Sequence, residues 1–503
     1  MLKHVLPISL VVGLAAAILT NCGGNNSTTS TTTPTGGLVG LISDAPLCDA
    51  ISVQVTLQDV DLKAVGTGAI THFIQTTPSF APAIKVNLQS LRDQPSVLYV
   101  NTVKEGTYDK ATVQIQFFQI ATYDPTQDPP VKILNGDLGG NTAPEVAINP
   151  PLVVESGKVS ALRFEFDVAR SLVLDNQGQI TGAVNPVIHA TPVNPIESGQ
   201  LAQLPNLVGF VRSVSTAKTT SNANYIGSFQ LQLLSASTSG APAVAVNFTQ
   251  DPGTTVIPPQ TLPEIVTNNF AEVSGYLDQG GNLVGQTVEF EDHEDPINNR
   301  IALSGPIVSL TKDVSGNVTQ FSQWVKDEQP ADEFGIPLDT IVQVNLSPST
   351  TYQVSALANN FANLPFGTTS FAMGQEVTVH GPYTKPTTTT TPPEPTTVAA
   401  EKVFLRDQAF QGSLGALLQV GSDNRTGAFS LAPCCTLLKS APVYVLTNNE
   451  TVFVNVTGLS ALTPQGSLLI RGVPFFQPAA ATINGISVPA GTLVMLARQV
   501  HVL

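Results

Sequence analysis

Short runs of alternating apolar and polar residues recur along the chain from residue 38 onward. The segments 51–57 (ISVQVTL), 113–117 (VQIQF) and 162–166 (LRFEF) place apolar side chains at every second position. This period of two is typical of a strand with one buried face. Three-turn amphipathic helices are hard to find, and 39 glycines and 38 prolines divide the apolar runs. The pattern predicts an all-β protein.

The first 21 residues depart from this pattern. A short basic leader, residues 1–4, precedes a mainly apolar run from Val5 to Leu19. The run is shorter than the roughly 20 residues that a membrane-spanning helix needs, and it fits the core of a signal peptide. We therefore expect residues 1–21 to be a signal peptide.

Cys22 follows this leader in the sequence Leu19-Thr20-Asn21-Cys22-Gly23, which resembles a lipobox. In a lipobox the cysteine thiol is acylated and the cysteine becomes the new N-terminus, although Gly, Ala or Ser normally stands where Asn21 does. The resemblance implies lipid attachment at Cys22 and an anchor in the cell envelope, at the outer membrane or the cell surface. Ordinary secretion after residues 15–17 is the alternative.

Residues 22–37 read CGGNNSTTSTTTPTGG and contain no aliphatic side chain. Such a segment cannot form a core, so we expect a disordered tether. A flexible coil of this length would reach about 20 Å and hold the folded domains off the membrane.

Length and charge narrow the picture further. A chain of 503 residues is too long for one core and suggests three or four domains. Charged residues make up only 12%, and the net charge is −15. Phosphate backbones demand clustered cations, which this sequence lacks, so nucleic acid is not expected as a partner.

Three landmarks occur in order in the first 160 residues after the tether: SDAP at 43–46, EGTY at 105–108, and FDVARSLV at 166–173 followed by PVI at 186–188. At these positions the chain resembles the bacterial domain-of-unknown-function family 4382, whose members are commonly lipid-anchored or secreted. The resemblance covers residues 38–195. It implies a β-sandwich of prealbumin-like type and no known activity.

Each landmark has a structural interpretation. Asp44 before Ala-Pro suits an Asx turn, and Gly106-x-Tyr108 at a strand entrance resembles a tyrosine corner. Asp167 and Arg170 are placed to pair across a turn. The alternative is that Asp44 and Asp167 bind a hard cation, although calcium needs six or more oxygens.

The remainder of the chain repeats itself about every 100 residues. In each unit a strand runs into a glycine (Gly275, Gly381 or Gly472), and a closing strand carries Gly-x-x-Val at 285–288 or Ala-x-x-Val at 400–403 and 497–500. This spacing indicates domain duplication rather than a solenoid. The units resemble domain-of-unknown-function family 5666, and their length fits small OB-like barrels. We expect barrels over 203–293, 300–407 and 408–503, the second with a Thr/Pro loop at 385–397 that cannot pair as a strand.

Three cysteines besides Cys22 remain. Cys434 and Cys435 are adjacent, and Cys48 follows the SDAP motif. Export favours disulfides, so we expect a vicinal Cys434–Cys435 bond, with free buried thiols or a bridge to Cys48 as alternatives. No His or further Cys stands near the pair, so a metal site is not expected there.

Two other features are ambiguous. Glu289 to Asp295 contains five acidic residues and one histidine, and we interpret it as a solvated linker, with a calcium site as the alternative. Trp324 is the single tryptophan. We expect it in a core or a domain seam rather than on the surface as a sugar platform.

No G-x-S-x-G elbow, H-E-x-x-H helix, P-loop or dinucleotide fingerprint occurs, so we expect no catalytic residue, cofactor or metal. The sequence favours a lipid-anchored envelope protein that binds a glycan or protein, adheres, or has a structural role. The alternative is an extracellular enzyme, or an accessory module, acting on envelope or environmental polysaccharide.

Overall fold

A computed structural model describes residues 34–44, 50–75, 84–91, 95–177, 179–193, 200–217, 224–233, 243–293, 300–329, 340–355, 366–384, 396–434, 442–463, 466–483 and 485–503. Strands dominate these residues, which confirms the predicted all-β class with a sandwich and small closed barrels. The expected signal peptide, Cys22, Cys48, Cys435 and residues 385–395 of the Thr/Pro loop lie outside the described residues.

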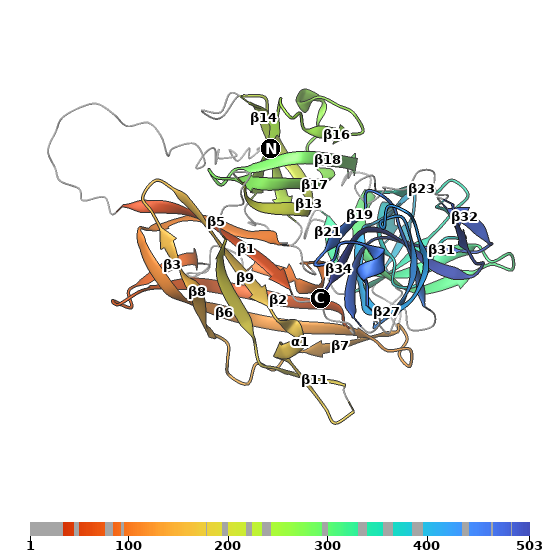
Figure 1. Cartoon of the computed structure of the whole chain (residues 1–503), viewed down its shortest axis with the longest axis horizontal. Coiled ribbons are helices and arrows are strands. Elements are labelled where there is room, and N and C mark those ends of the chain that lie inside the picture. The colour runs from red at the N-terminus through yellow and green to blue at the C-terminus, as the bar shows by residue number, and fades with distance from the viewer. Residues whose placement is uncertain are drawn as a thin grey trace, which may run out of the picture.

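The N-terminal unit is a β-sandwich (Figure 1). It consists of β1 (Thr35–Asp44), β2 (Ala50–Ala64), β3 (Ile70–Gln75), β4 (Ile84–Asn87), β5 (Ser96–Lys104), β6 (Gly106–Tyr123), β7 (Val131–Asn135), β8 (Glu145–Val154), β9 (Val159–Phe166), β10 (Leu172–Leu174), β11 (Ile180–Val184) and β12 (Ile188–Val193), with η1 (Leu88–Leu91) and α1 (Val168–Ser171). Its main strand order is β3-β2-β6-β8-β12-β9-β1-β5. Strands β8 and β12 pair only at Ile148 and Ala190, so the sheet folds over itself at that point.

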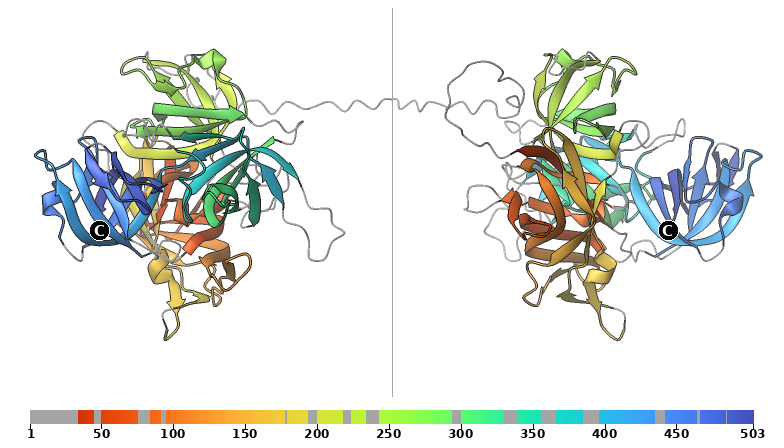
Figure 2. Two further views of the ribbon diagram at one scale, coloured as in Figure 1. Left: turned by 90° about the vertical axis from the view of Figure 1, so that its right-hand side faces the viewer. Right: turned by 60° about the vertical axis from the view of Figure 1, so that its left-hand side comes forward.

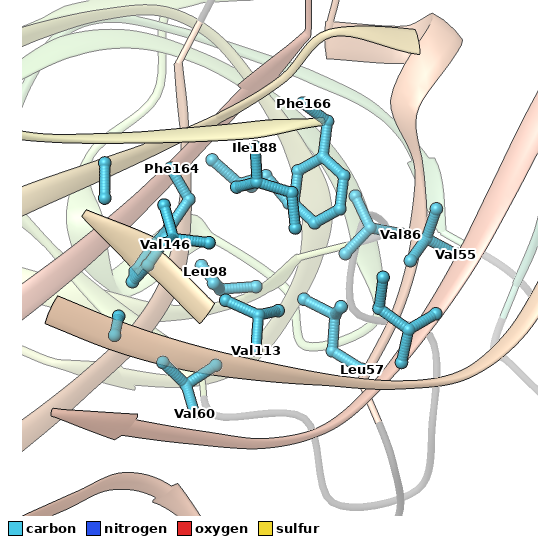
Figure 3. Packing of buried hydrophobic residues seen from close by; sticks show 14 of the residues in the cluster. Val55, Leu57, Val60, Val86, Leu98, Val113, Val146, Phe164, Phe166 and Ile188 are labelled. Carbon is cyan, nitrogen blue, oxygen red and sulfur yellow. The ribbon is translucent and has the colours of Figure 1, made fainter. Parts of the chain in front are cut away.

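Both halves of the folded sheet contribute to one core (Figure 3). Alternating residues of β2 and β6, such as Leu57 and Val113, face Phe164 and Phe166 of β9 and Ile188 of β12. This is the buried face that the period-two pattern predicts.

Strand β1 begins at Thr35, before the expected end of the tether at residue 37. Gly36 and Gly37 pair with Val103 and Thr102 of β5. A Cβ at residue 36 would lie 2.4 Å from the carbonyl oxygen of Glu155, so close packing of the backbone accounts for the glycine. The absence of aliphatic side chains therefore did not exclude a strand here, because pairing uses backbone groups alone.

Three barrels follow. The first consists of β13 (Gln200–Ser215), β14 (Tyr225–Leu233), β15 (Ala243–Thr249), β16 (Thr255–Ile257), η3 (Leu262–Glu264), β17 (Asn269–Asp278) and β18 (Leu283–His293). The second consists of β19 (Arg300–Lys312), β20 (Val318–Trp324), β21 (Asp327–Gln329), β22 (Ile341–Asn345), β23 (Thr351–Val354), β24 (Glu376–Thr384), β25 (Thr397–Ala399) and β26 (Lys402–Leu405). The third consists of β27 (Gln408–Val420), β28 (Gly427–Pro433), β29 (Val443–Thr447), β30 (Val452–Val454), η6 (Leu459–Ala461), β31 (Ser467–Gln477), β32 (Ala481–Ile483), β33 (Ile486–Val488) and β34 (Thr492–Val502).

All three barrels share one connectivity. In the first barrel the order is β15-β14-β13-β17-β18, and β18 closes the barrel by pairing in parallel with β15. The third barrel repeats this arrangement with β29-β28-β27-β31-β34. In the second the closing strand is divided into β25 and β26, and β25 pairs in parallel with β22. This is the OB-like topology that the repeat predicts. Thr397, expected in the Thr/Pro loop, is the first residue of β25.

The glycines that mark the repeat lie where two strands approach closely. A Cβ at Gly275, Gly381 or Gly472 would lie 2.1, 2.1 or 1.9 Å from a carbonyl oxygen of the closing strand. Any larger residue at these three positions would therefore force the barrel open.

A threonine occupies an equivalent place in each barrel, and we call Thr254, Thr350 and Thr451 the barrel pins. Each hydroxyl donates to the repeat's marked Gly or Ala on the closing strand, over 2.8 Å from Thr254 to the Gly285 carbonyl, 2.7 Å from Thr350 to Ala400 and 2.8 Å from Thr451 to Ala497. Each hydroxyl also accepts from a backbone N–H at the start of its own turn, from Thr249, Ser347 and Asn448. The pins therefore fix the turn after the third strand to the closing strand.

The units lie side by side (Figures 1 and 2), and apolar seams join them. Val39 and Leu41, on the face of β1 that points away from the sandwich core, pack with Leu201 and Leu204 of the first barrel. The third barrel packs Val473 and Phe475, with other outward side chains, on the second barrel. Because both faces of such strands are buried, the units form one continuous body.

Trp324 lies in the seam between the sandwich and the barrels. Its ring is 1% exposed, and it packs in one cluster with Ile51 of the sandwich and Phe410 of the third barrel. Its indole Nε1–H donates to the Ser52 hydroxyl over 3.3 Å. The expectation of a core or seam position is confirmed.

Replacing Thr451 by Val should destabilise the protein by about 2 kcal/mol, because Val keeps the shape but leaves the Asn448 N–H and the Ala497 carbonyl without this partner. Urea unfolding followed by tryptophan fluorescence measures the effect. Thr451→Ser, which retains the hydroxyl, is the control and should lose clearly less. A loss in Thr451→Val no larger than that in Thr451→Ser would contradict the role assigned to the hydroxyl.

Candidate functional site

A buried junction of charged and polar side chains lies where the three barrels meet. At its centre are three consecutive residues, Arg406 and Asp407, which connect β26 to β27, and Gln408, the first residue of β27. We call them the clamp. All three are less than 8% exposed.

Arg406 extends to the first barrel. Its Nη1–H donates to Glu272 Oε2 over 2.7 Å, and its Nε–H donates to the Thr378 hydroxyl of the second barrel over 2.8 Å. The guanidinium also lies 4.4 Å from the centroid of the Phe270 ring. Arginine suits this position because its planar fork can bond and stack at the same time.

Asp407 points to the third barrel. Its Oδ2 accepts from Nη2 of Arg498 on β34 over 2.5 Å. Burial disfavours the charged guanidinium of Arg498, but the charge of Asp407, its hydrogen bond and the charge of Glu272 outweigh that penalty and hold the pKa of Arg498 above its ordinary value. Arg498 therefore remains charged inside the junction.

Gln408 points to the second barrel. Its Nε2 donates to the Gly374 carbonyl over 2.8 Å, and its Oε1 accepts from the Glu376 N–H over 2.6 Å. Three consecutive residues thus bind three different barrels. Neighbouring residues can reach different barrels where the backbone is extended, because successive side chains of an extended chain point in opposite directions.

A second buried group adjoins Arg406. Glu272 and Glu289 are directly opposed on the antiparallel strands β17 and β18 of the first barrel. The Ser355 hydroxyl, just after β23 of the second barrel, lies 3.0 Å from Glu272 Oε2 and 2.8 Å from Glu289 Oε2. The three side chains are 2%, 6% and 0% exposed. This group joins the first barrel to the second.

The sequence did not predict this junction. Glu272 stands in an alternating strand as an ordinary outward residue would, and Arg406 and Asp407 stand in a connection where charged residues are common. A signal was present in both glutamates, since Glu272 lies three residues before the repeat-marking Gly275 and Glu289 directly follows the repeat-marking Val288 on the paired strand. Their partners are 134 and 66 residues away, which no local pattern reveals.

The structure describes only one of the cysteines. Cys434 takes part in a disulfide, and its N–H donates to the Gln411 carbonyl over 3.0 Å. Cys22, Cys48 and Cys435 lie outside the described residues. The vicinal bond and the lipid attachment at Cys22 stay predictions.

The family landmarks have structural roles where they are described. The buried Tyr108 hydroxyl donates to the Lys104 carbonyl over 2.6 Å, as the tyrosine-corner interpretation predicts. Asp167 accepts from the Arg170 N–H over 3.0 Å as the N-cap of α1, and the two side chains form an ion pair at 3.4 Å. Asp44 ends β1 beside residues outside the description, so its Asx turn stays a prediction.

The interpretation of residues 289–295 as a solvated linker is wrong for its first half. Strand β18 continues to His293, and Glu289 is buried against Ser355. The acidic composition of the segment suggested that its side chains are exposed. Glu289 is buried instead, because its partner Ser355 belongs to the second barrel, which covers it. Residues 294–295 lie outside the described part.

Two kinds of feature are absent from the described residues. No group of three or more His, Cys, Asp or Glu side chains is placed to hold a metal ion. No helix there is long and apolar enough to cross a membrane.

Comparison with known proteins bears on the first unit. Residues 35–181 match the family model described as "Domain of unknown function (DUF4382)". The N-terminal unit is thus similar to DUF4382. The match begins at the first residue of β1 and ends within β11, so it covers most of the sandwich. No curated protein and no solved structure matches the chain. The resemblance of the barrels to family 5666 stays a prediction.

Replacing Asp407 by Asn should destabilise the protein by about 3 kcal/mol, because it leaves the buried Arg498 charge without its counter-ion. Urea unfolding at neutral pH measures this change. The control is Glu155→Gln in the exposed Glu155–Lys158 pair, which should change stability by no more than about 0.5 kcal/mol. Similar losses in the two variants would mean that the clamp does not bear on stability.

Proposed function

We propose that the chain is exported, anchored to the cell envelope by lipid on Cys22, and works there as a rigid, non-enzymatic binding, adhesion or structural protein. The N-terminal leader, the lipobox-like sequence and the tether support the anchor. The DUF4382 match supports no particular activity.

The disulfide of Cys434 supports the exported location. Disulfides persist in oxidising compartments and are rare in the cytosol. The low share of charged residues, 12%, agrees with a surface built from amides and hydroxyls rather than ion pairs.

The junction between the barrels is the observation that carries the proposed role. Its charged groups are buried and bonded to one another across units, so they hold the units in a fixed arrangement. Arg406 joins the second barrel to the first, and Asp407 joins it to the third. A protein with fixed units presents one constant outer surface, and a flexible tether holds that surface off the membrane, which suits binding, adhesion or support.

Intact-mass analysis of protein extracted from native membranes tests the anchor. The expected mass is that of a chain beginning at Cys22 plus a diacylglyceryl group. Cys22→Ala should lose this mass and appear in the soluble fraction, because no thiol remains to be acylated.

Ser27→Ala, also within the tether, is the matched control and should stay in the membrane fraction. A mass equal to that of an unmodified chain beginning near Ile18 would contradict the anchor. The protein would then be freely secreted, and its partners should be sought in the medium.

A further inference from the structure

Exposed apolar side chains gather at one end of the sandwich. Val65, which follows β2, donates its N–H to the Thr107 carbonyl over 2.9 Å. Thr107 is paired with Val153 of β8. Val65 is 46% exposed and Val153 is 54% exposed. Two valines that are open to solvent therefore lie on either side of Thr107.

The turn from β2 to β3 adds to this group. Its sequence, VGTGAI at 65–70, contains no charged residue, and all six residues are exposed. Ile70, the first residue of β3, is 56% exposed. A Cβ added at Gly66 or Gly68 would meet nothing within 4 Å, so the turn projects into open space. Turns are normally polar, and grouped apolar side chains on a surface indicate contact with an apolar partner. We call Val65, Ile70 and Val153 the apolar end.

The described chain begins beside the apolar end. The Pro34 carbonyl accepts from the Glu105 N–H over 2.9 Å, and Glu105 is two residues before Thr107. The Thr35 carbonyl accepts from the N–H of Gly157, in the turn that follows β8, over 3.0 Å. The start of β1 is therefore fixed next to the strands that carry the apolar end.

The distance from Cys22 to this point is short. Twelve residues, 23–34, separate Cys22 from Thr35. A flexible chain of that length spans about 20 Å, and about 40 Å when fully extended. A lipid on Cys22 would therefore keep the apolar end within this distance of the bilayer.

The third barrel lies at the other end of the sandwich. Ile51, near the start of β2, packs in one cluster with Phe410 of the third barrel, whereas Val65 follows the last residue of β2. Strand β2 has 15 residues, and at about 3.3 Å per residue its ends lie roughly 45 Å apart. Leu418 of β27 in the third barrel is 44% exposed. It provides a comparison of similar exposure without a neighbouring tether.

We infer that the apolar end docks on the bilayer that holds the lipid of Cys22, an inference that rests on the anchor in the proposed function. The tether raises the local concentration of the bilayer around the apolar end, so a few half-exposed side chains suffice for contact. These side chains enter the interfacial region, where they leave water. The tether sets how far the chain can reach, and docking fixes its orientation, with the third barrel facing outward.

Charge near the apolar end does not select a particular headgroup. Glu145 pairs with both Lys63 and Lys110, and Glu155 pairs with Lys158. These carboxylates offset the positive charge of the lysines, so apolar contact rather than attraction to anionic lipid accounts for docking. A bilayer of zwitterionic phosphatidylcholine is therefore a sufficient probe.

Quenching of tryptophan by brominated lipid tests the docking. The lipidated full chain with Ile70→Trp, extracted from native membranes, is reconstituted into phosphatidylcholine vesicles with or without bromine on the acyl chains. Trp324 is 1% exposed and gives the same background in every variant. The added tryptophan should lose most of its emission in brominated vesicles, because bromine quenches only on contact. Adding Val65→Asp and Val153→Asp should restore most of that emission, since the two charges oppose entry into lipid.

Leu418→Trp is the matched control, and its emission should be the same in both kinds of vesicle. Flotation of each variant with the vesicles, measured first, separates the two claims. A lipidated chain that does not float contradicts the anchor, and the docking with it. A chain that floats but is quenched equally at residues 70 and 418, or at neither, overturns the docking and leaves the anchor intact.

Discussion

The second and third barrels meet at three consecutive residues, two in the connection and one at the start of β27, and each side chain reaches a different barrel. Arg406 binds Glu272 in the first, Asp407 binds Arg498 in the third, and Gln408 binds the backbone of the second. These are charged or polar groups taken out of water, so each is tolerated only with its partner in place. The relative positions of the barrels thus depend on this clamp.

Around the clamp, apolar seams supply most of the buried surface while the polar contacts fix geometry. Apolar contacts lack direction and would permit sliding of one barrel on another. The buried contacts of Arg406 with Glu272 and Thr378 do not, because they require particular distances and angles. The barrels themselves are held by a separate device, the pins, which is repeated three times. Each barrel is therefore closed by the same threonine-to-backbone hydrogen bond. At the junction, in contrast, each barrel contributes different residues to the contacts.

The sequence predicted the elements well because they rest on local periodicity. The alternation in residues 51–57 located β2, and the glycines at 275, 381 and 472 located the narrow crossing of each barrel. The OB-like closure followed from the length and the repeat. The pins left no comparable signal, because Thr254, Thr350 and Thr451 precede the marked Gly or Ala by spacings that range from 31 to 50 residues.

The junction could not be predicted in the same way. Ser52 and Glu272 occupy outward positions of their strands, where a polar residue normally faces water, and both are buried by another unit. Burial of this kind depends on contacts such as Trp324 with Ser52, 272 residues apart. Alternation records which face a strand turns to its own core, but it contains no information on what covers the other face.

Differential scanning calorimetry of the purified chain tests the central claim that the clamp and the seams make the four units one body. If they do, the chain unfolds in a single transition, and the calorimetric enthalpy equals the van't Hoff enthalpy. Two or more separate transitions, or a calorimetric enthalpy several times the van't Hoff value, would contradict the account. The units would then unfold independently, and the junction would be no more than a point of contact.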